Sequence, residues 1–282
     1  MSTNDALLQQ LRQTPVPLDH WRATKVGLDN SGPYRAEYRS LEVREEGSNP
    51  LVDVSRYGLV SGDIYVDEFL AGVVEHAPAH SSGVLFSRGL LRETHARRLA
   101  KVDAFLRSCG LCLFIRSAWR DPVLQDTARF AYAKRAGDNE AAALFAPTHA
   151  SGAPSPHSTG AAFDVELVDI RSGTFPVMRA QVNGKDVVGL YELEELAAAQ
   201  PSHFVGNCRA TRALQNRRIL YHALCSQGVA LDDSAALFVE HPGEFWHFGD
   251  GDPLSAYLAR EPYARCGRLT PGPDLERESG VV

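Results

Sequence analysis

The chain has 282 residues, of which 44% are hydrophobic and 23% are charged. This balance is ordinary for a soluble globular protein and supplies enough apolar side chains for a sizeable core. The formal net charge of -6 argues against a nucleic-acid binder, which usually carries a basic face. No apolar run approaches the roughly 18 residues of a membrane span. Residues 1–11 are polar and lack the apolar core of a secretory signal, so we expect a cytoplasmic protein without a nucleic-acid or membrane partner.

The cysteines do not indicate a disulfide framework, because their number is odd and they are scattered through the chain. Cys109 and Cys112 form a C-x-x-C pair, but Gly110 between them is typical of a helix end. No second pair is present in the sequence to complete a zinc ribbon. We therefore interpret both cysteines as core residues.

The hydrophobic pattern predicts several elements in the first half of the chain. Residues 51–57 alternate apolar and polar side chains, as a strand does. Residues 92–109 carry apolar side chains at helical spacing, and Gly110 follows where a glycine commonly ends a helix. A strand is expected at 111–115, and a further helix from Pro122 toward Phe145, since proline suits the first turn of a helix.

The second half of the chain has two clear elements with a weakly patterned segment between them. Residues 161–167 read as a buried strand, and residues 211–227 as a helix. Residues 168–207 show little periodicity, which is typical of a functional loop, a disordered loop or an insertion. We infer one α+β domain at 51–265, with a large and acidic insertion at about 171–201.

The ends of the chain differ from this domain in composition. Residues 1–50 contain many prolines and glycines and read as an N-terminal extension that wraps the core. Residues 266–282 look like a flexible tail. The sequence leaves the oligomeric state open.

Two short stretches carry the chemistry. In the first, His157 leaves a loop rich in proline and glycine, and Asp164 follows within the apolar strand. A carboxylate in such a strand is costly unless it is paired or bound to metal, although a satisfied core aspartate beside a loop histidine would also explain it. In the second stretch, Glu244 precedes His247 by three residues. On a strand these positions face opposite sides, so the spacing requires a turn or bulge at residues 242–243.

Taken together, the two stretches supply two imidazoles and a carboxylate from His157, Asp164 and His247. Three protein ligands with one open position are the usual composition of a catalytic zinc site. Glu244 is then placed to accept a proton from the attacking water and return it to a leaving amine. Arg120 ends a predicted strand and is our choice for the charge that stabilises an oxyanion, with Arg116 on the same strand end as the alternative.

These residues carry a family resemblance. The motif S-x-H-x-x-G-x-A-x-D at 155–164 and the later E-x-W-H at 244–247 resemble those of zinc D-Ala-D-Ala peptidases, a DD-peptidase-like family. Within it, the likeness is greatest to the VanX-type D-alanyl-D-alanine dipeptidases, and it extends to the strand and arginine turn at 111–122. The resemblance covers roughly residues 50–260, with strong agreement at these three motifs.

The resemblance implies a Zn²⁺ ion held by His157, Asp164 and His247, and a small peptide substrate such as D-Ala-D-Ala. It implies Glu244 as general base and acid and Arg120 as the residue that stabilises the tetrahedral intermediate. Ser155 would contribute to substrate binding near the metal. The implied fold is a small mixed or antiparallel sheet flanked by helices, with the active site lying across the sheet.

The sequence departs from the family at two places. Residues 118–122 read A-W-R-D-P, where the family usually has G-Y-R-P. The short acidic motif that receives the substrate ammonium group in the dipeptidases is not reproduced after Asp164. The candidates for the missing carboxylate are Asp169, Asp186, Glu192 and Glu194.

Other functions fit parts of the pattern. The same site would serve a D,D- or L,D-carboxypeptidase or another amidohydrolase. A non-haem iron enzyme also uses two histidines and a carboxylate, but its usual H-x-D spacing is absent and it has no need of Glu244. A non-catalytic zinc-binding scaffold would need neither Glu244 nor Arg120 to hold the metal.

Overall fold

A computed structural model shows how these elements are arranged. It describes residues 3–18, 38, 40–45, 47–62, 89–120, 125, 130, 133–134, 137, 155–225, 238–241 and 243–269. The predicted α+β class is confirmed, since five α-helices in the described part of the chain surround small mixed and antiparallel sheets. No helix in these described ranges is long and apolar enough to span a membrane.

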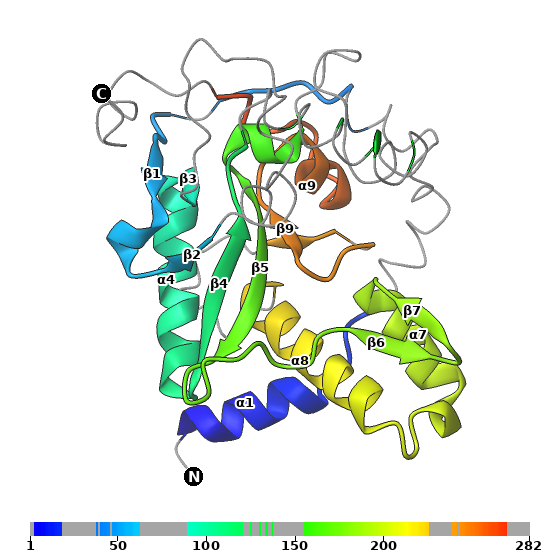
Figure 1. The fold of residues 1–282 in the computed structure, drawn as a ribbon. Helices are drawn as coiled ribbons and strands as arrows, with labels where there is room; N and C mark the ends of the chain where they lie inside the picture. Colours follow the sequence, from blue (N-terminus) through cyan, green and yellow to red (C-terminus); the bar gives the residue numbers. More distant parts are fainter. Residues whose placement is uncertain are drawn as a thin grey trace.

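The main sheet has five strands in the order β2-β4-β5-β9-β8 (Figure 1). The strands β2 and β4 are parallel, and the other neighbours are antiparallel. The two longest strands, β4 and β5, are neighbours near the middle of the sheet. Most of their residues are buried, on both faces of the sheet. The five strands are Val60–Ser61 (β2), Leu111–Ser117 (β4), Ala162–Asp169 (β5), Val239–Glu240 (β8) and His247–Gly249 (β9).

One face of the sheet is covered by helices. Phe163, Val165 and Leu167 alternate along β5 and are fully buried in the main hydrophobic cluster. That cluster also includes the apolar sides of α4 (Glu93–Ser108) and α8 (Cys208–Cys225), which Figure 1 shows lying against β4 and β5. Because side chains alternate along a strand, Asp164 and Glu166 of β5 point to the opposite face.

The strongly periodic elements lie where the sequence predicts them. The helix expected at 92–109 is α4, and Gly110 follows it with φ +81°, a conformation that glycine adopts without strain. The helix expected at 211–227 is α8, which begins three residues earlier. The strand expected at 51–57 is only partly correct, since β1 (Leu51–Asp53) gives way to the 3-10 helix η2 (Val54–Tyr57). Most of the helix expected at 122–145 lies outside the described residues.

The weakly patterned segment after β5 contains regular structure. Strands β6 (Ala180–Val182) and β7 (Lys185–Val187) form an antiparallel hairpin. Its two-residue turn, Asn183-Gly184, has positive φ at both positions, which is the usual chemistry of a tight hairpin turn. Helix α7 (Leu190–Ala199) and the 3-10 turn η6 (Pro201–His203) follow, and α7 packs against α8.

Segments from both ends of the chain pack on the domain. Helix α1 (Thr3–Gln13) lies along α8 and buries Leu8 and Leu11 against it (Figure 1). Strand β3 (Leu90–Arg92) pairs with β1, and α9 (Pro253–Leu258) follows β9. A single bridge joins Val43 to Ala264, which brings the N-terminal region beside the segment that follows α9.

Candidate metal centre

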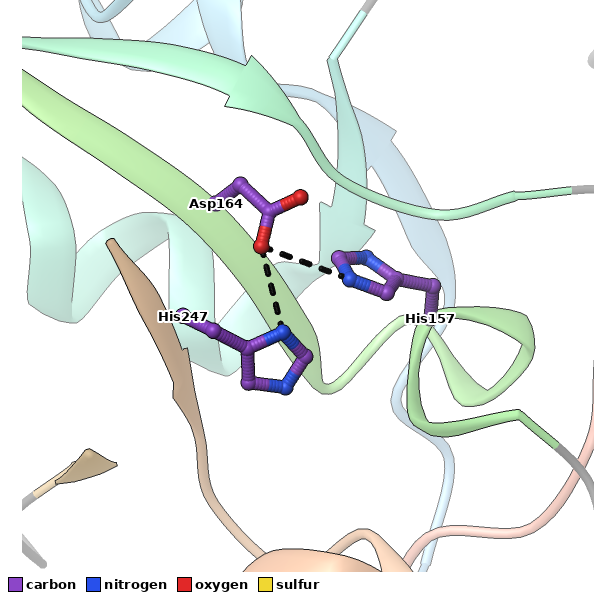
Figure 2. Close-up of side chains that lie close together, drawn as sticks. All are labelled: His157, Asp164 and His247. Atoms are coloured by element: carbon purple, nitrogen blue, oxygen red, sulfur yellow. Dashed lines mark hydrogen bonds and ion pairs between the residues drawn. The ribbon is translucent and has the colours of Figure 1, made fainter. Parts of the chain in front are cut away.

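Three side chains from separate elements converge on the face of the sheet opposite α4 and α8. Figure 2 shows Asp164 on β5 between the rings of His247, on β9, and His157, on the 3-10 helix η5 (Pro156–Thr159). Asp164 Oδ1 is 3.1 Å from His247 Nδ1 and 3.5 Å from His157 Nε2. All three ligand atoms lie within 4.8 Å of one another, and all three residues are buried. The sequence-predicted ligand set is thus brought together.

The backbone fixes each of these side chains. Asp164 and His247 are directly opposite each other in the β5–β9 ladder, so they share one face of the sheet. His157 reaches them from η5, whose end is marked by Gly160 with φ +69°. The His157 Nδ1 atom lies 2.9 Å from the Ala118 carbonyl oxygen. Since a carbonyl only accepts, Nδ1 carries the hydrogen, and Nε2 is the ring nitrogen left to face Asp164.

Burial and neighbouring charges set the protonation of the cluster. Burial, with the nearby Arg120 charge, lowers the pKa of His157 to about 4, so this imidazole is neutral at neutral pH. Burial alone would raise the pKa of Asp164, but the two imidazoles outweigh it and hold that pKa well below its usual range. For His247, burial opposes the charge, yet the bond to Asp164 and the Glu244 charge raise its pKa.

The donor set fits a divalent metal such as zinc. Zinc binds imidazole nitrogen at about 2.0–2.1 Å and carboxylate oxygen at about 2.0–2.2 Å, so tetrahedral ligand atoms lie about 3.3 Å apart. The two distances from Asp164 Oδ1, 3.1 and 3.5 Å, bracket that spacing. The imidazole rings stand nearly perpendicular, with centroids 4.8 Å apart, and one nitrogen of each ring lies near the same carboxylate oxygen.

Glu244 lies at the edge of this cluster. Its Oε2 atom is 3.8 Å from His247 Nδ1, and its side chain is 23% exposed. The chain turns between β8 and β9, since the Glu244 amide donates to the His241 carbonyl and the His247 amide donates to the Glu244 carbonyl. This turn includes Gly243, as the spacing of the motif requires, while Pro242 lies outside the described residues. It places the glutamate and the histidine on the same side.

Arg120 is held next to the candidate ligands. Its Nη2 atom is 3.7 Å from Asp164 Oδ2 and donates to Ser117 Oγ at 3.0 Å, and Nη1 donates to Gln125 Oε1 at 2.5 Å. Its backbone amide donates to the His157 carbonyl. Arg116, the alternative from the sequence, instead donates to Glu166 Oε1 at 2.6 Å. Arg120 therefore lies next to Asp164, whereas the charge of Arg116 is paired with Glu166.

The loop that carries His157 is bound from three directions. The backbone amide of Arg92 donates to the Gly160 carbonyl, and the side-chain Nε of Arg92 donates to the Thr159 carbonyl at 2.8 Å. The same guanidinium donates to the Gly267 carbonyl and to both carboxylate oxygens of Glu45. A side chain at Gly160 would bring its Cβ within 2.5 Å of the Leu51 side chain, so the loop fits closely against β1. The position of His157 thus depends on residues outside the motif.

Ser155 begins this loop and is 2% exposed. Its carbonyl accepts hydrogen bonds from the backbone and the hydroxyl of Ser158, which closes the first turn of η5. The residue therefore lies two positions before His157 on a tightly bonded turn. Its predicted contact with substrate remains a prediction.

Sequence reasoning missed several residues around the site. Ser117 and Gln125 hold Arg120, and nothing in their local pattern marks them, because their role depends on contacts that only the fold creates. The acidic candidates from the sequence are engaged or exposed elsewhere. Asp169 accepts backbone amides in a turn, Glu194 binds Arg218 with both oxygens, and Asp186 and Glu192 are exposed on β7 and α7.

Comparisons with known proteins give one informative similarity. No protein-family model matches the chain. A curated D-alanyl-D-alanine dipeptidase from Synechocystis sp. (strain ATCC 27184 / PCC 6803 / Kazusa) is 32% identical over 104 residues. The match spans 37% of this chain and 37% of the relative's length. The chain is therefore similar to a part of that dipeptidase, which agrees with the resemblance in the motifs.

Proposed function

We propose that the protein is a zinc-dependent hydrolase of short peptides, and that its substrate is a D,D-dipeptide such as D-alanyl-D-alanine. The observation that carries the proposal is the buried cluster of His157, Asp164 and His247, with ligand atoms within 4.8 Å of one another and Glu244 beside it. The similarity to part of a D-alanyl-D-alanine dipeptidase supports the same chemistry.

A zinc ion bound by these three residues would supply the Lewis acidity that activates water and polarises a peptide carbonyl. Three protein donors are typical of catalytic rather than structural zinc sites, because a structural site is closed by four. The neutral state of His157 at neutral pH suits this role, since only an imidazole nitrogen without its proton can bind a metal.

The remaining groups have distinct tasks in this proposal. Glu244 accepts a proton from the attacking water and delivers it to the leaving amine, and its partial exposure gives it access to substrate. Arg120 provides a fixed positive charge for the oxyanion that develops during the attack. Its bonds to Ser117 and Gln125 hold the guanidinium in place, so little reorganisation is needed. Ser155 contributes to substrate binding at the start of the His157 loop.

The test is a panel of free and N-blocked dipeptides, with D,D and L,D stereochemistry, assayed with and without added Zn²⁺. We expect zinc-dependent release of the C-terminal amino acid from a free D,D-dipeptide and no cleavage of its N-acetyl form. A dipeptidase holds both charged termini of its substrate, so blocking the amine removes a required contact. If the wild-type protein loaded with zinc cleaves none of the peptides, the proposed function is wrong.

Two other outcomes would redirect the proposal. Cleavage of N-blocked peptides as fast as free ones would identify a carboxypeptidase on the same site. Iron as the bound metal, without peptide cleavage, would favour the non-haem iron chemistry that two histidines and a carboxylate also support.

A further inference from the structure

A second charged pair lies on the same face of the sheet as the candidate metal ligands. Glu166 follows Asp164 by two residues on β5, and the fully buried Val165 between them faces the helices. Arg116 lies at the irregularity of β4 between Ile115 and Ser117, and Ser117 is paired with Asp164. Both members of this pair are therefore presented beside the cluster rather than in the helix-covered core.

Glu166 has one carboxylate oxygen in use and one available. Arg116 Nη1 donates to Glu166 Oε1 at 2.6 Å. Glu166 Oε2 makes no hydrogen bond to any residue that the structure describes. The two side chains are only 20% and 11% exposed, for Arg116 and Glu166 respectively. A carboxylate that is this buried gains when its second oxygen also receives a charged donor, since unmet polar groups are costly there.

The spacing of Glu166 from the metal ligands suits the end of a peptide. Two residues along a strand span about 6.4–6.8 Å. In a peptide with a free N-terminal residue, the ammonium nitrogen is about 2.5 Å from the first carbonyl carbon. An ammonium–carboxylate hydrogen bond adds about 2.8 Å. A carboxylate that binds the ammonium thus lies about 5 Å from the carbonyl being attacked, within reach of Glu166 when that carbonyl is beside Asp164.

We propose that Glu166 binds the free α-ammonium group of the substrate through Oε2, while Arg116 holds Oε1 and fixes the carboxylate. This inference rests on the proposed peptidase function and adds to it the residue that recognises the free amino terminus next to the scissile bond. It also assigns a carboxylate that none of Asp169, Asp186, Glu192 and Glu194 provides at the described site. The limit on peptide length at the amino-terminal side then follows from Glu166.

The experiment compares D-alanyl-D-alanine with propionyl-D-alanine, which has the same shape but no ammonium group. Wild-type protein loaded with Zn²⁺ should prefer the free dipeptide. Glu166→Gln should lower kcat/KM for D-alanyl-D-alanine by about 10- to 100-fold, mainly through KM, because a charged hydrogen bond is lost. The rate on propionyl-D-alanine should not fall, so the preference between the two substrates collapses. Glu166→Asp, which keeps the charge, should restore part of it.

Controls separate binding from folding. Glu93→Gln removes the acid of an ion pair with Arg97 on α4 and should leave the substrate preference unchanged. Zinc content and the thermal midpoint show whether Glu166→Gln is folded. If the midpoint falls because the Arg116–Glu166 ion pair is lost, the double variant Glu166→Gln with Arg116→Met removes both charges, and it should lose the preference as well.

The two proposals fail in different ways. If wild-type protein cleaves the free dipeptide and Glu166→Gln keeps the full preference over propionyl-D-alanine, the role of Glu166 is overturned while the peptidase function stands. If the zinc-loaded wild-type protein cleaves neither compound nor any other dipeptide, the proposed function fails, and the role of Glu166 with it.

Discussion

At the scale of single residues, Asp164 joins the parts of the candidate site. Its carboxylate lies within 4 Å of nitrogen atoms from His157, His247 and Arg120. The sequence alone predicted that an aspartate in an apolar strand needs such partners, because its burial is otherwise costly. It could not show Glu166 as a companion, since that residue becomes notable only when the alternation of β5 and its pairing with β4 are known.

Glu240, on β8, is another buried acid, and it lies opposite Phe248 in the ladder rather than beside His247. Both of its oxygens are buried and lack a hydrogen-bond partner among the described residues. Burial raises its pKa well above the ordinary value, and the attraction of Arg217 only partly opposes this. Glu240 therefore holds its proton to a higher pH in the folded protein than in the unfolded chain.

This burial predicts a pH-dependent gain of stability in Glu240→Gln. The folded-state pKa is raised, so the folded protein keeps a proton that the unfolded chain releases. The contribution of Glu240 is intact below its unfolded pKa of about 4.3 and is lost as the pH rises toward the folded value. The variant should match wild type near pH 4.5 and exceed it by about 1–3 kcal/mol at pH 8.

Urea unfolding of both proteins at pH 4.5, 6 and 8 measures this difference. Glu93→Gln is the control, since the ion pair with Arg97 lowers the pKa of Glu93 and that variant should gain nothing at high pH. A Glu240→Gln protein that is less stable than wild type at pH 8 would show that the carboxylate has a compensating partner.

At the scale of elements, the predictions succeeded where periodicity is long. Helix α4, strand β4 and helix α8 each carry a sustained apolar face, and that face determines their position. Strand β9 has only three residues, too few for a pattern, although it carries His247. The β6–β7 hairpin was missed even though Asn183-Gly184 is a strong turn signal, because the strands beside it are short.

The η5 loop illustrates how one element depends on others for its function. Arg92 from β3 bonds the Thr159 and Gly160 carbonyls, so it holds the turn that presents His157 without touching the cluster. Arg92→Met should lower the affinity for Zn²⁺ by about 10- to 100-fold, the usual effect of losing a group that orients a ligand. Arg92→Lys, which keeps the charge and one donor, should recover part of the affinity.

Competition with a chelator of known zinc affinity measures this change without relying on activity. Arg97→Met is a matched control, since Arg97 lies on α4, its side chain is 65% exposed, and its guanidinium pairs with Glu93. Equal zinc affinity of Arg92→Met and wild type would mean that η5 holds His157 on its own.

At the scale of the whole molecule, segments far apart in the sequence, around residue 45 and at residues 267–269, meet at the site loop. Glu45 bonds Arg92 and the Gly267 amide, and the Leu269 amide donates to the Ser158 carbonyl. The sequence predicted an N-terminal extension and a C-terminal tail at these positions. It could not predict their contacts with each other, because Glu45 and Gly267 are more than 200 positions apart and such contacts leave no local pattern. The sequence motifs predicted the candidate metal ligands, whereas the residues that hold the ligand loop in place could be identified only from the fold.

The central claim is that His157, Asp164 and His247 form one metal site that serves hydrolysis. Elemental analysis of protein purified with limiting Zn²⁺ tests it most directly. We expect one zinc per chain in wild type and in Glu244→Ala, which should nevertheless lose about 10²- to 10⁴-fold in turnover of the dipeptide. His157→Ala and Asp164→Ala should hold little or no zinc. Full zinc content in those two ligand variants, or near wild-type turnover in Glu244→Ala, would contradict the account.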